Sequence, residues 1–132
     1  MLNKLLALGL ALGLLSACGT SYESAVKQAA QQRWNALIAG QLDEAYRFYT
    51  DAFQTITPLD NFKKSIRGVG FWHKAEVQQV QCDSAEKRCE VDVVVTVAMK
   101  MRGLPEPMET SDLIHEVWVK QGWLSDWRYI KD

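Results

Sequence analysis

Acid–base chemistry near the C-terminal end of the chain would depend first on Glu116 and on its surroundings. The dipeptide Gln121-Gly122 is typical of a two-residue turn, which would pair Lys120 with Trp123. In that register Glu116 lies directly opposite Trp127, as a carboxylate among aromatic rings. An apolar surrounding raises a carboxyl pKa, as a general base or a ligand anchor requires. The alternative is structural: Glu116 points to solvent or pairs with Lys120.

The opposite face of the same hairpin holds a second candidate group around His115. The register places His115 across from Arg128 and diagonal to Asp126, within side-chain reach. Catalysis by His115 and Asp126 would need a pocket around them, and on a half-exposed sheet the same residues form a surface cluster. The sequence contains no G-x-S-x-G, H-E-x-x-H, P-loop or Rossmann glycine pattern. It therefore indicates no reaction, and we expect neither a metal nor a cofactor.

A different chemistry is indicated at Cys18, which directly follows a short apolar segment. Residues 5–15 are apolar but too few to span a bilayer, which needs about 20 residues, so they are typical of a secretory signal peptide. The sequence Leu-Ser-Ala-Cys at 15–18 resembles the bacterial lipobox, whose cysteine thiol receives diacylglycerol and whose freed amine takes a further acyl chain. We predict a signal peptide over 1–17, lipidation at Cys18 and an acylated tether over 18–21. The alternatives are a plain signal peptide or a small anchor helix.

The cellular location that this signal predicts determines the expected state of the other two cysteines. Gly19, where a retention signal would have Asp, favours the outer membrane, with the domain facing the periplasm. Cys82 and Cys89 flank a polar, turn-like segment, and in an oxidising periplasm we expect them to form a disulfide. The closed loop would stabilise the fold by about 2.5 kcal/mol before strain is subtracted. Free thiols or a metal pair are the alternatives, but His73 and His115 fall at no ligand spacing to these cysteines.

Composition limits the partners and the domain count. The chain has 15 Lys and Arg against 16 Asp and Glu, a net charge of −1. A nucleic-acid-binding surface would need an excess of basic residues, so we expect no nucleic-acid partner. Without its first 17 residues the chain is long enough for one domain and not for two. We place that domain at 22–132.

Three amphipathic helices are predicted in the first half of the domain. The first has apolar side chains at helical spacing and stops at Gly40. The second runs from Leu42 to Phe53, and the third is capped at Thr57 and ends before Gly68. The predicted buried positions are Val26, Ala30, Trp34, Leu37 and Ile38 in the first helix, and Phe62 and Ile66 in the third.

Beyond residue 72 the apolar period changes from about 3.6 to 2. Strands are predicted over 72–82, 89–101, about 110–120 and 123–130, with a bulge near Gln78-Gln79 in the first. Helices first and an antiparallel sheet last predict an α+β fold, in which three N-terminal helices pack on a curved four-stranded antiparallel sheet.

Two segments carry a resemblance to a known superfamily. They are RWNALIAGQLDEAYRFYTDAF at 33–53 and HEVWVKQGWLSDWRYIKD at 115–132, joined by long strands. The chain resembles the nuclear transport factor 2-like superfamily over about 22–132, and more narrowly the small bacterial lipoproteins that share its cystatin-like cone. Cystatin-like inhibitors share the same gross plan. The resemblance implies a sheet curved round its helices with a cavity at the open end. It implies no single function, because the fold serves enzymes, binding modules and assembly domains.

We therefore expect the functional sites to lie in the cone and on the sheet surface. Non-catalytic binding of a small ligand or of an envelope protein is the main hypothesis, and a small isomerase or dehydratase using Glu116 or His115 and Asp126 is the alternative. Strand residues such as Val94 and Ala98, together with the resemblance, suggest a homodimer through the sheets. The side chains expected to line or to fill the cone are Trp34, Tyr46, Tyr49, Phe53, Phe62 and Trp118.

Overall fold

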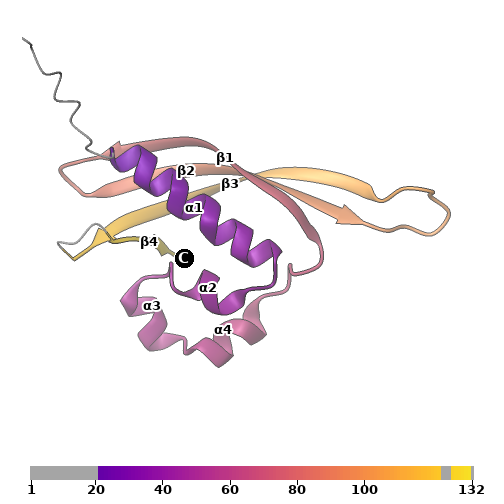
Figure 1. The fold of residues 1–132 in the computed structure, drawn as a ribbon, viewed down its shortest axis with the longest axis horizontal. Helices are drawn as coiled ribbons and strands as arrows, with labels where there is room; N and C mark the ends of the chain where they lie inside the picture. Colours follow the sequence, from indigo (N-terminus) through magenta and orange to yellow (C-terminus); the bar gives the residue numbers. More distant parts are fainter. Residues whose placement is uncertain (1–20, 123–125, 132) are drawn as a thin grey trace, which may run out of the picture.

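A computed structural model describes residues 21–122 and 126–131, in the order of four helices and four strands. The helices are α1 (Tyr22–Ile38), α2 (Leu42–Tyr46), α3 (Asp51–Ile56) and α4 (Leu59–Ser65). The strands are β1 (Trp72–Asp83), β2 (Arg88–Met99), β3 (Met108–Gln121) and β4 (Asp126–Ile130). They form one antiparallel sheet in chain order, with α1 lying across one face and α2 to α4 gathered below it (Figure 1). The predicted α+β class is confirmed. The predicted signal peptide and Cys18 lie outside the described residues.

The first helix follows its apolar periodicity. The spacing of Val26, Ala30, Trp34 and Leu37 at three and four residues makes one stripe, and all four side chains are buried against the sheet. The hydroxyl of Ser21 accepts a hydrogen bond from the amide of Ser24 at 3.2 Å and caps the helix. Gly40 has a φ of 73° immediately after the helix, a conformation that glycine adopts without steric cost. The predicted stop at Gly40 is thus confirmed.

The second predicted helix is wrong, because the chain between α2 and α3 bonds to the sheet instead. The carbonyl of Phe48 accepts a hydrogen bond of 2.6 Å from the amide of Tyr129, and Tyr49 forms a parallel bridge to Tyr129. Thr50 then caps α3 by accepting a hydrogen bond from the amide of Phe53 at 3.2 Å. The domain therefore has four helices before the sheet, where three were predicted. Thr57 ends α3, so the predicted third helix is α4, capped at Pro58, and its Phe62 is buried as expected.

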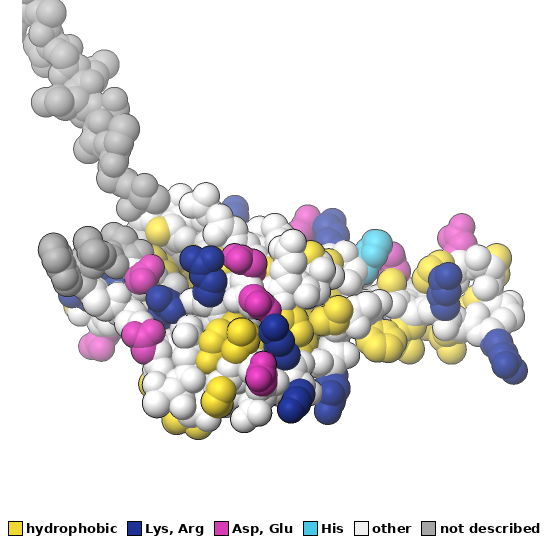
Figure 2. Space-filling view, turned by 60° about the horizontal axis from the view of Figure 1, so that its bottom comes forward, with side chains coloured by type: hydrophobic (Ala, Val, Ile, Leu, Met, Phe, Trp, Pro, Cys, Tyr) yellow, Lys and Arg dark blue, Asp and Glu magenta, His cyan; other side chains and the backbone are white. Residues whose placement is uncertain are grey.

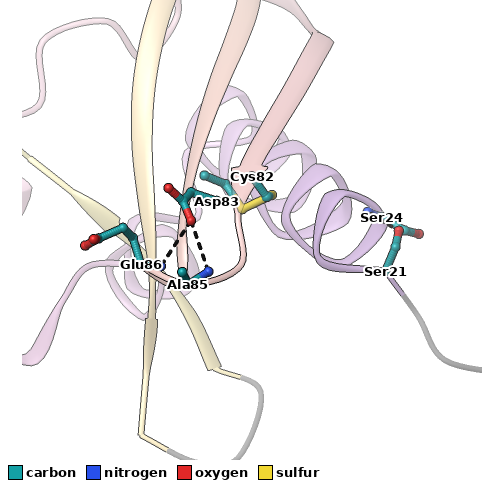
Figure 3. Close-up of a disulfide and its surroundings, with 7 residues drawn as sticks. Ser21, Ser24, Cys82, Asp83, Ala85 and Glu86 are labelled. Atoms are coloured by element: carbon teal, nitrogen blue, oxygen red, sulfur yellow. Dashed lines mark hydrogen bonds between the residues drawn. A yellow bond between two sulfur atoms is a disulfide. The ribbon is translucent and has the colours of Figure 1, made fainter.

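The sheet confirms the first two predicted strands within a few residues. Its register shifts between Val77 and Gln79, where the bulge was predicted. Cys82 and Cys89 are direct cross-strand partners and form a disulfide, with 4.0 Å between their Cα atoms. In the turn beside it, the carboxylate of Asp83 accepts hydrogen bonds from the backbone amides of Ala85 at 3.0 Å and Glu86 at 3.2 Å (Figure 3). The predicted disulfide is confirmed, and it closes the β1–β2 hairpin.

The last hairpin has a different register from the prediction. Lys120 pairs with Trp127, and Gln121 with Asp126, so the predicted pairing of Lys120 with Trp123 is wrong. The last strand is described over Asp126–Ile130, and the predicted strand residues 123–125 lie outside the described residues. In the observed register Trp127 is buried against α1, with its ring 5.1 Å from that of Tyr22. This aromatic contact favours the observed register of β3 with β4, because it buries a large ring.

One part of the sheet extends beyond the helices. Trp72, at the start of β1, pairs with Val97, so only β2 and β3 continue past that point. The two strands pair as far as Met99 and Met108 and are joined by residues 100–107. This projecting hairpin, which we name the arm and define as residues 97–110, extends away from the helical layer (Figure 1).

Candidate functional site

The interior of the fold contains a buried ion pair between α1 and β3. Arg33 is 5% exposed and Glu116 is 2% exposed. The guanidinium Nη1 donates to Glu116 Oε2 at 2.8 Å. The same oxygen accepts from the indole of Trp34 at 2.9 Å, and Oε1 accepts from the indole of Trp118 at 3.1 Å. Both carboxylate oxygens therefore already accept hydrogen bonds, and Glu116 is a structural partner of Arg33 inside the core.

Aromatic side chains surround the arginine of this pair. Its Nη2 donates to the hydroxyl of Tyr49 at 2.8 Å, and its Cζ atom lies 3.9 Å from the ring centre of Tyr129. Burial alone would lower the pKa of Arg33, but the charge of Glu116 and the side chains of Tyr49 and Tyr129 outweigh it, so the pKa of Arg33 is raised. Arg33 was missed by the sequence analysis. A charged residue beside Trp34 gives no signal that its side chain turns inward.

The side chains that were predicted to line or to fill a cone pack against one another or against the sheet. The rings of Tyr49 and Phe53 stack with their centres 4.7 Å apart, and those of Tyr49 and Phe62 meet edge to face at 4.9 Å. Tyr46 packs on Phe62 at 5.2 Å and donates a hydrogen bond to the carbonyl of Thr57 at 2.8 Å. The buried members of the predicted set are Trp34, Tyr49, Phe62 and Trp118. These residues form a core that holds the helices on the sheet.

The second predicted group is not brought together. His115 pairs across the sheet with Asp92 on β2, with 2.7 Å between its Nδ1 and the carboxylate Oδ1. Asp126 forms its ion pair with Arg128 at 3.2 Å, and Val119, not His115, lies opposite Arg128. The hydrogen bond to Asp92 raises the pKa of His115. The expected pairing of His115 with Asp126 is wrong because the hairpin register differs by four residues.

An open cleft of about 800 Å³ lies beside the core, between α1, the α2–α3 segment and β4. Its α1 wall contains the small side chains of Ala25 and Ala29 between the amides of Gln28 and Gln32. None of the residues predicted for the pocket lines it, because the aromatic side chains that lie deepest are already packed together. The remaining lining residues are Tyr22, Glu44, Arg47, Phe48, Asp51, Gln54, Asp126, Trp127 and Arg128.

Arg128 fixes the far wall of this cleft. Its Nη1 donates to the carbonyls of Arg47 at 2.7 Å and of Tyr49 at 3.1 Å, and its Nη2 pairs with Asp126. Strand β4 is thereby held against the segment between α2 and α3. Arg47 pairs in turn with Glu44 at 3.4 Å, so both cations of the cleft already have carboxylate partners. The cleft therefore has no free cation for an anionic ligand among its described lining residues.

Over 21–122 and 126–131, no three His, Cys, Asp or Glu side chains are grouped so that they could hold a metal ion. In the same residues no helix is both long and apolar enough to cross a bilayer.

Comparison with known proteins supports the fold and nothing finer. No protein-family model and no curated protein matches the sequence. A crystal structure of a SEC-C motif containing protein from Psychrobacter arcticus matches 80% of this chain with a TM-score of 0.52 and 14% identity, and this chain spans 58% of that protein. A proposed polyketide cyclase from Xanthomonas campestris pv. campestris matches 85% of this chain, which spans 93% of it, with a TM-score of 0.37 and 12% identity. The first of these two structures supports the α+β fold of this chain.

Proposed function

We propose that this protein is a lipid-anchored binding protein of the bacterial envelope, without catalytic activity, whose ligand occupies the cleft between α1 and β4. The proposed anchor is acylated Cys18, and Gly19 favours the outer membrane, with the domain facing the periplasm. The observation that carries the ligand site is the cleft of about 800 Å³, a volume within the range of small-molecule sites.

The lining supports a neutral, hydroxyl-rich small molecule such as a sugar. Gln28 and Gln32 each offer a donor and an acceptor, and neither has a side-chain hydrogen-bond partner among the described residues. The carboxylates of Asp51 and Asp126 add acceptors, while Tyr22 and Trp127 add aromatic surface beside them. Such a mixture of flat apolar surface and bidentate polar groups fits a ring that carries many hydroxyls. The paired arginines give no advantage to an anion.

An enzyme of the isomerase or dehydratase type is the less supported alternative. Its proposed base, Glu116, accepts hydrogen bonds on both oxygens inside the core. Its other proposed pair, His115 and Asp126, has different partners in the sheet and at the hairpin end. Binding, which needs no free base, accounts better for these contacts.

A replacement that fills the cleft tests the proposal. We expect saturation-transfer NMR on the mature lipoprotein in detergent micelles to detect at least one member of a panel of neutral mono- and disaccharides. Gln32→Trp should weaken that binding about tenfold or more, because its ring would occupy the cleft from an exposed helix position. Lys27→Trp is the matched control, since Lys27 is exposed on the same helix but does not line the cleft. Equal loss in both variants, or no signal from any sugar with the wild type, would refute the proposal.

A further inference from the structure

Exposed apolar side chains collect at one end of the molecule. Of the eight large hydrophobic side chains that are exposed among the described residues, six lie on the arm or on the segment that leads into β1. The backbone joins these two parts, since the carbonyl of Phe71 accepts a hydrogen bond from the amide of Ala98 at 3.0 Å. Figure 2 shows hydrophobic side chains along the arm. We name this set the apolar end: Val69, Phe71, Met99, Met101, Leu104 and Met108.

The apolar pattern of β2 continues beyond the helices that cover it. The core-facing residues Val91, Val93 and Val95 are 0%, 1% and 3% exposed, whereas Met99 on the same face is 49% exposed. Its cross-strand partner Met108 is 47% exposed. The alternation is therefore that of a buried strand face, while nothing in the described residues covers its last part. Isolated exposed hydrophobics are common, but a continuous set at the end of a core face indicates a contact surface.

The area of the apolar end is at the upper limit for the largest apolar patch of a monomer, and such patches are often functional. At roughly 100 Å² for each half-exposed large side chain, six side chains offer about 600 Å². A standard protein interface buries about 800 Å² on each partner, and the largest apolar patch of an ordinary monomer is about 300–600 Å². Three of the six are methionines, whose flexible thioethers adapt to a facing surface.

We propose that the apolar end is the interface between two copies of this chain, packed arm against arm about a two-fold axis that runs along the arm. A rotation about that axis places β2 of one copy over β3 of the other, at the same height. Lys100 and Arg102 follow the end of β2, Glu106 precedes β3, and Asp112 lies on the face of β3 that carries Met108. Glu109 lies on the opposite face, where it pairs with His73 at 3.6 Å, and takes no part in this contact. The basic residues of one copy then face the acidic residues of the other, on either side of the contact between the methionines. The net charge of −1 adds little repulsion between copies.

The lipid anchor would align the two copies, a step that rests on the proposed function. From Cys18 to Tyr22, the first residue of α1, the chain reaches at most about 14 Å, so α1 would begin close to the membrane. The arm projects from the other end of the molecule (Figure 1). Copies anchored in one leaflet would therefore hold their arms side by side and in the same direction. Restriction to one membrane raises their effective concentration, as a linker does.

Cysteine cross-linking in intact envelopes tests this arrangement. In Met99→Cys, a short bismaleimide should convert most of the protein to a covalent dimer, because Cys82 and Cys89 are already joined and do not react. Ile56→Cys is the matched control: Ile56 on α3 is 81% exposed but lies outside the apolar end, so it should remain monomeric. Equal dimer yields at both positions, or adducts of Met99→Cys with other proteins only, would overturn the proposal.

Sedimentation of the acylated protein in detergent gives an independent measurement. We expect a dimer for the wild type and at least a tenfold weaker association for Met99→Lys with Met108→Lys, with an unchanged circular dichroism spectrum. Both side chains are half-exposed, so the substitutions leave the core intact. A wild type that stays monomeric at every concentration would overturn self-association, even if sugar binding in the cleft is found. Loss of sugar binding in a protein that still dimerises would count only against the cleft.

Discussion

At the scale of single residues, the core depends on one ion pair. Replacement of Glu116 by Gln keeps the shape of the side chain but leaves the guanidinium of Arg33 without its counter-ion. Loss of one partner of a buried pair typically costs about 3–5 kcal/mol, because the other charge stays buried. We expect the free energy of unfolding of Glu116→Gln, measured by urea denaturation, to fall by about 3 kcal/mol or more.

The exposed pair of Glu44 and Arg47 provides the control. Their oxygen and nitrogen are 3.4 Å apart and both side chains are more than half exposed, so Glu44→Gln should change stability by less than about 1 kcal/mol. Replacement of both core partners, Arg33→Met with Glu116→Leu, should recover part of the loss, since no unpaired charge remains. If Glu116→Gln were as stable as Glu44→Gln, the buried ion pair would be wrong.

This pair also shows what single residues reveal in a sequence. Trp34 was predicted to be buried from its helical spacing, Trp118 was expected to line or to fill the cone, and both are buried. Glu116 was predicted to lie among aromatic rings and does contact two indoles, but its partner Arg33 is 83 positions away in the chain. No local pattern distinguishes an arginine that turns inward from one that points to solvent. The role of Glu116 therefore could not be settled from sequence.

At the scale of elements, the register of β3 determines the partner of His115. Because the hydrogen bond to Asp92 raises the pKa of His115, Asp92→Asn should lower that pKa, as measured by NMR titration of the imidazole. The folded-state pKa lies above the ordinary value of about 6.5. The pair therefore stabilises the fold below about pH 6.5, and its contribution is lost as the pH rises through the raised pKa. Since His115 is more than half exposed, we expect the contribution to be small.

Asp126→Asn is the matched control for this titration. The two-residue turn predicted from the sequence would make Asp126 a neighbour of His115, whereas in the structure Asp126 pairs with Arg128. We expect the pKa of His115 to be unchanged in Asp126→Asn. A larger shift in this variant than in Asp92→Asn would mean that the register of the last hairpin is wrong.

The two errors in the predicted elements have separate physical causes. A shift of four residues leaves the same side chains on each face of a strand, so alternation could not exclude the wrong register. The break between α2 and α3 follows from a hydrogen bond between Phe48 and Tyr129, which are distant in sequence. The disulfide, the bulge and α1 were predictable because each depends on residues that are near in sequence or share one strong pattern.

At the scale of the whole molecule, the proposed lipid anchor, ligand cleft and dimer interface lie at different places along the length of the molecule. Helix α1 begins at one end of the molecule and the arm extends from the other (Figure 1). The cleft lies between α1 and β4. A lipid anchor next to α1 would hold the cleft near the membrane and leave the arm free to meet a second copy. The packed core supports this arrangement of anchor, cleft and arm, because it connects α1 to β3 through Arg33 and Glu116.

The anchor is the proposal on which that arrangement depends, and intact-mass spectrometry tests it. We expect protein extracted from membranes to begin at Cys18 and to carry a diacylglycerol and an amide-linked acyl chain. One acyl chain binds a bilayer marginally, but several chains, at about 0.8 kcal/mol for each buried CH₂, hold it stably, so the protein should partition into the detergent phase on phase separation. In Cys18→Ser no thiol can be acylated, and residues 1–17 should remain attached.

The other cysteines separate lipidation from disulfide formation. Cys82→Ser with Cys89→Ser removes the disulfide, yet the added lipid mass and the detergent partitioning should persist, because neither residue follows the apolar segment. A wild type whose Cys18 is unmodified, or whose mature chain begins elsewhere, would remove the anchor. The short reach from membrane to α1 would then no longer align two copies, and dimerisation through the apolar end would have to occur without that alignment.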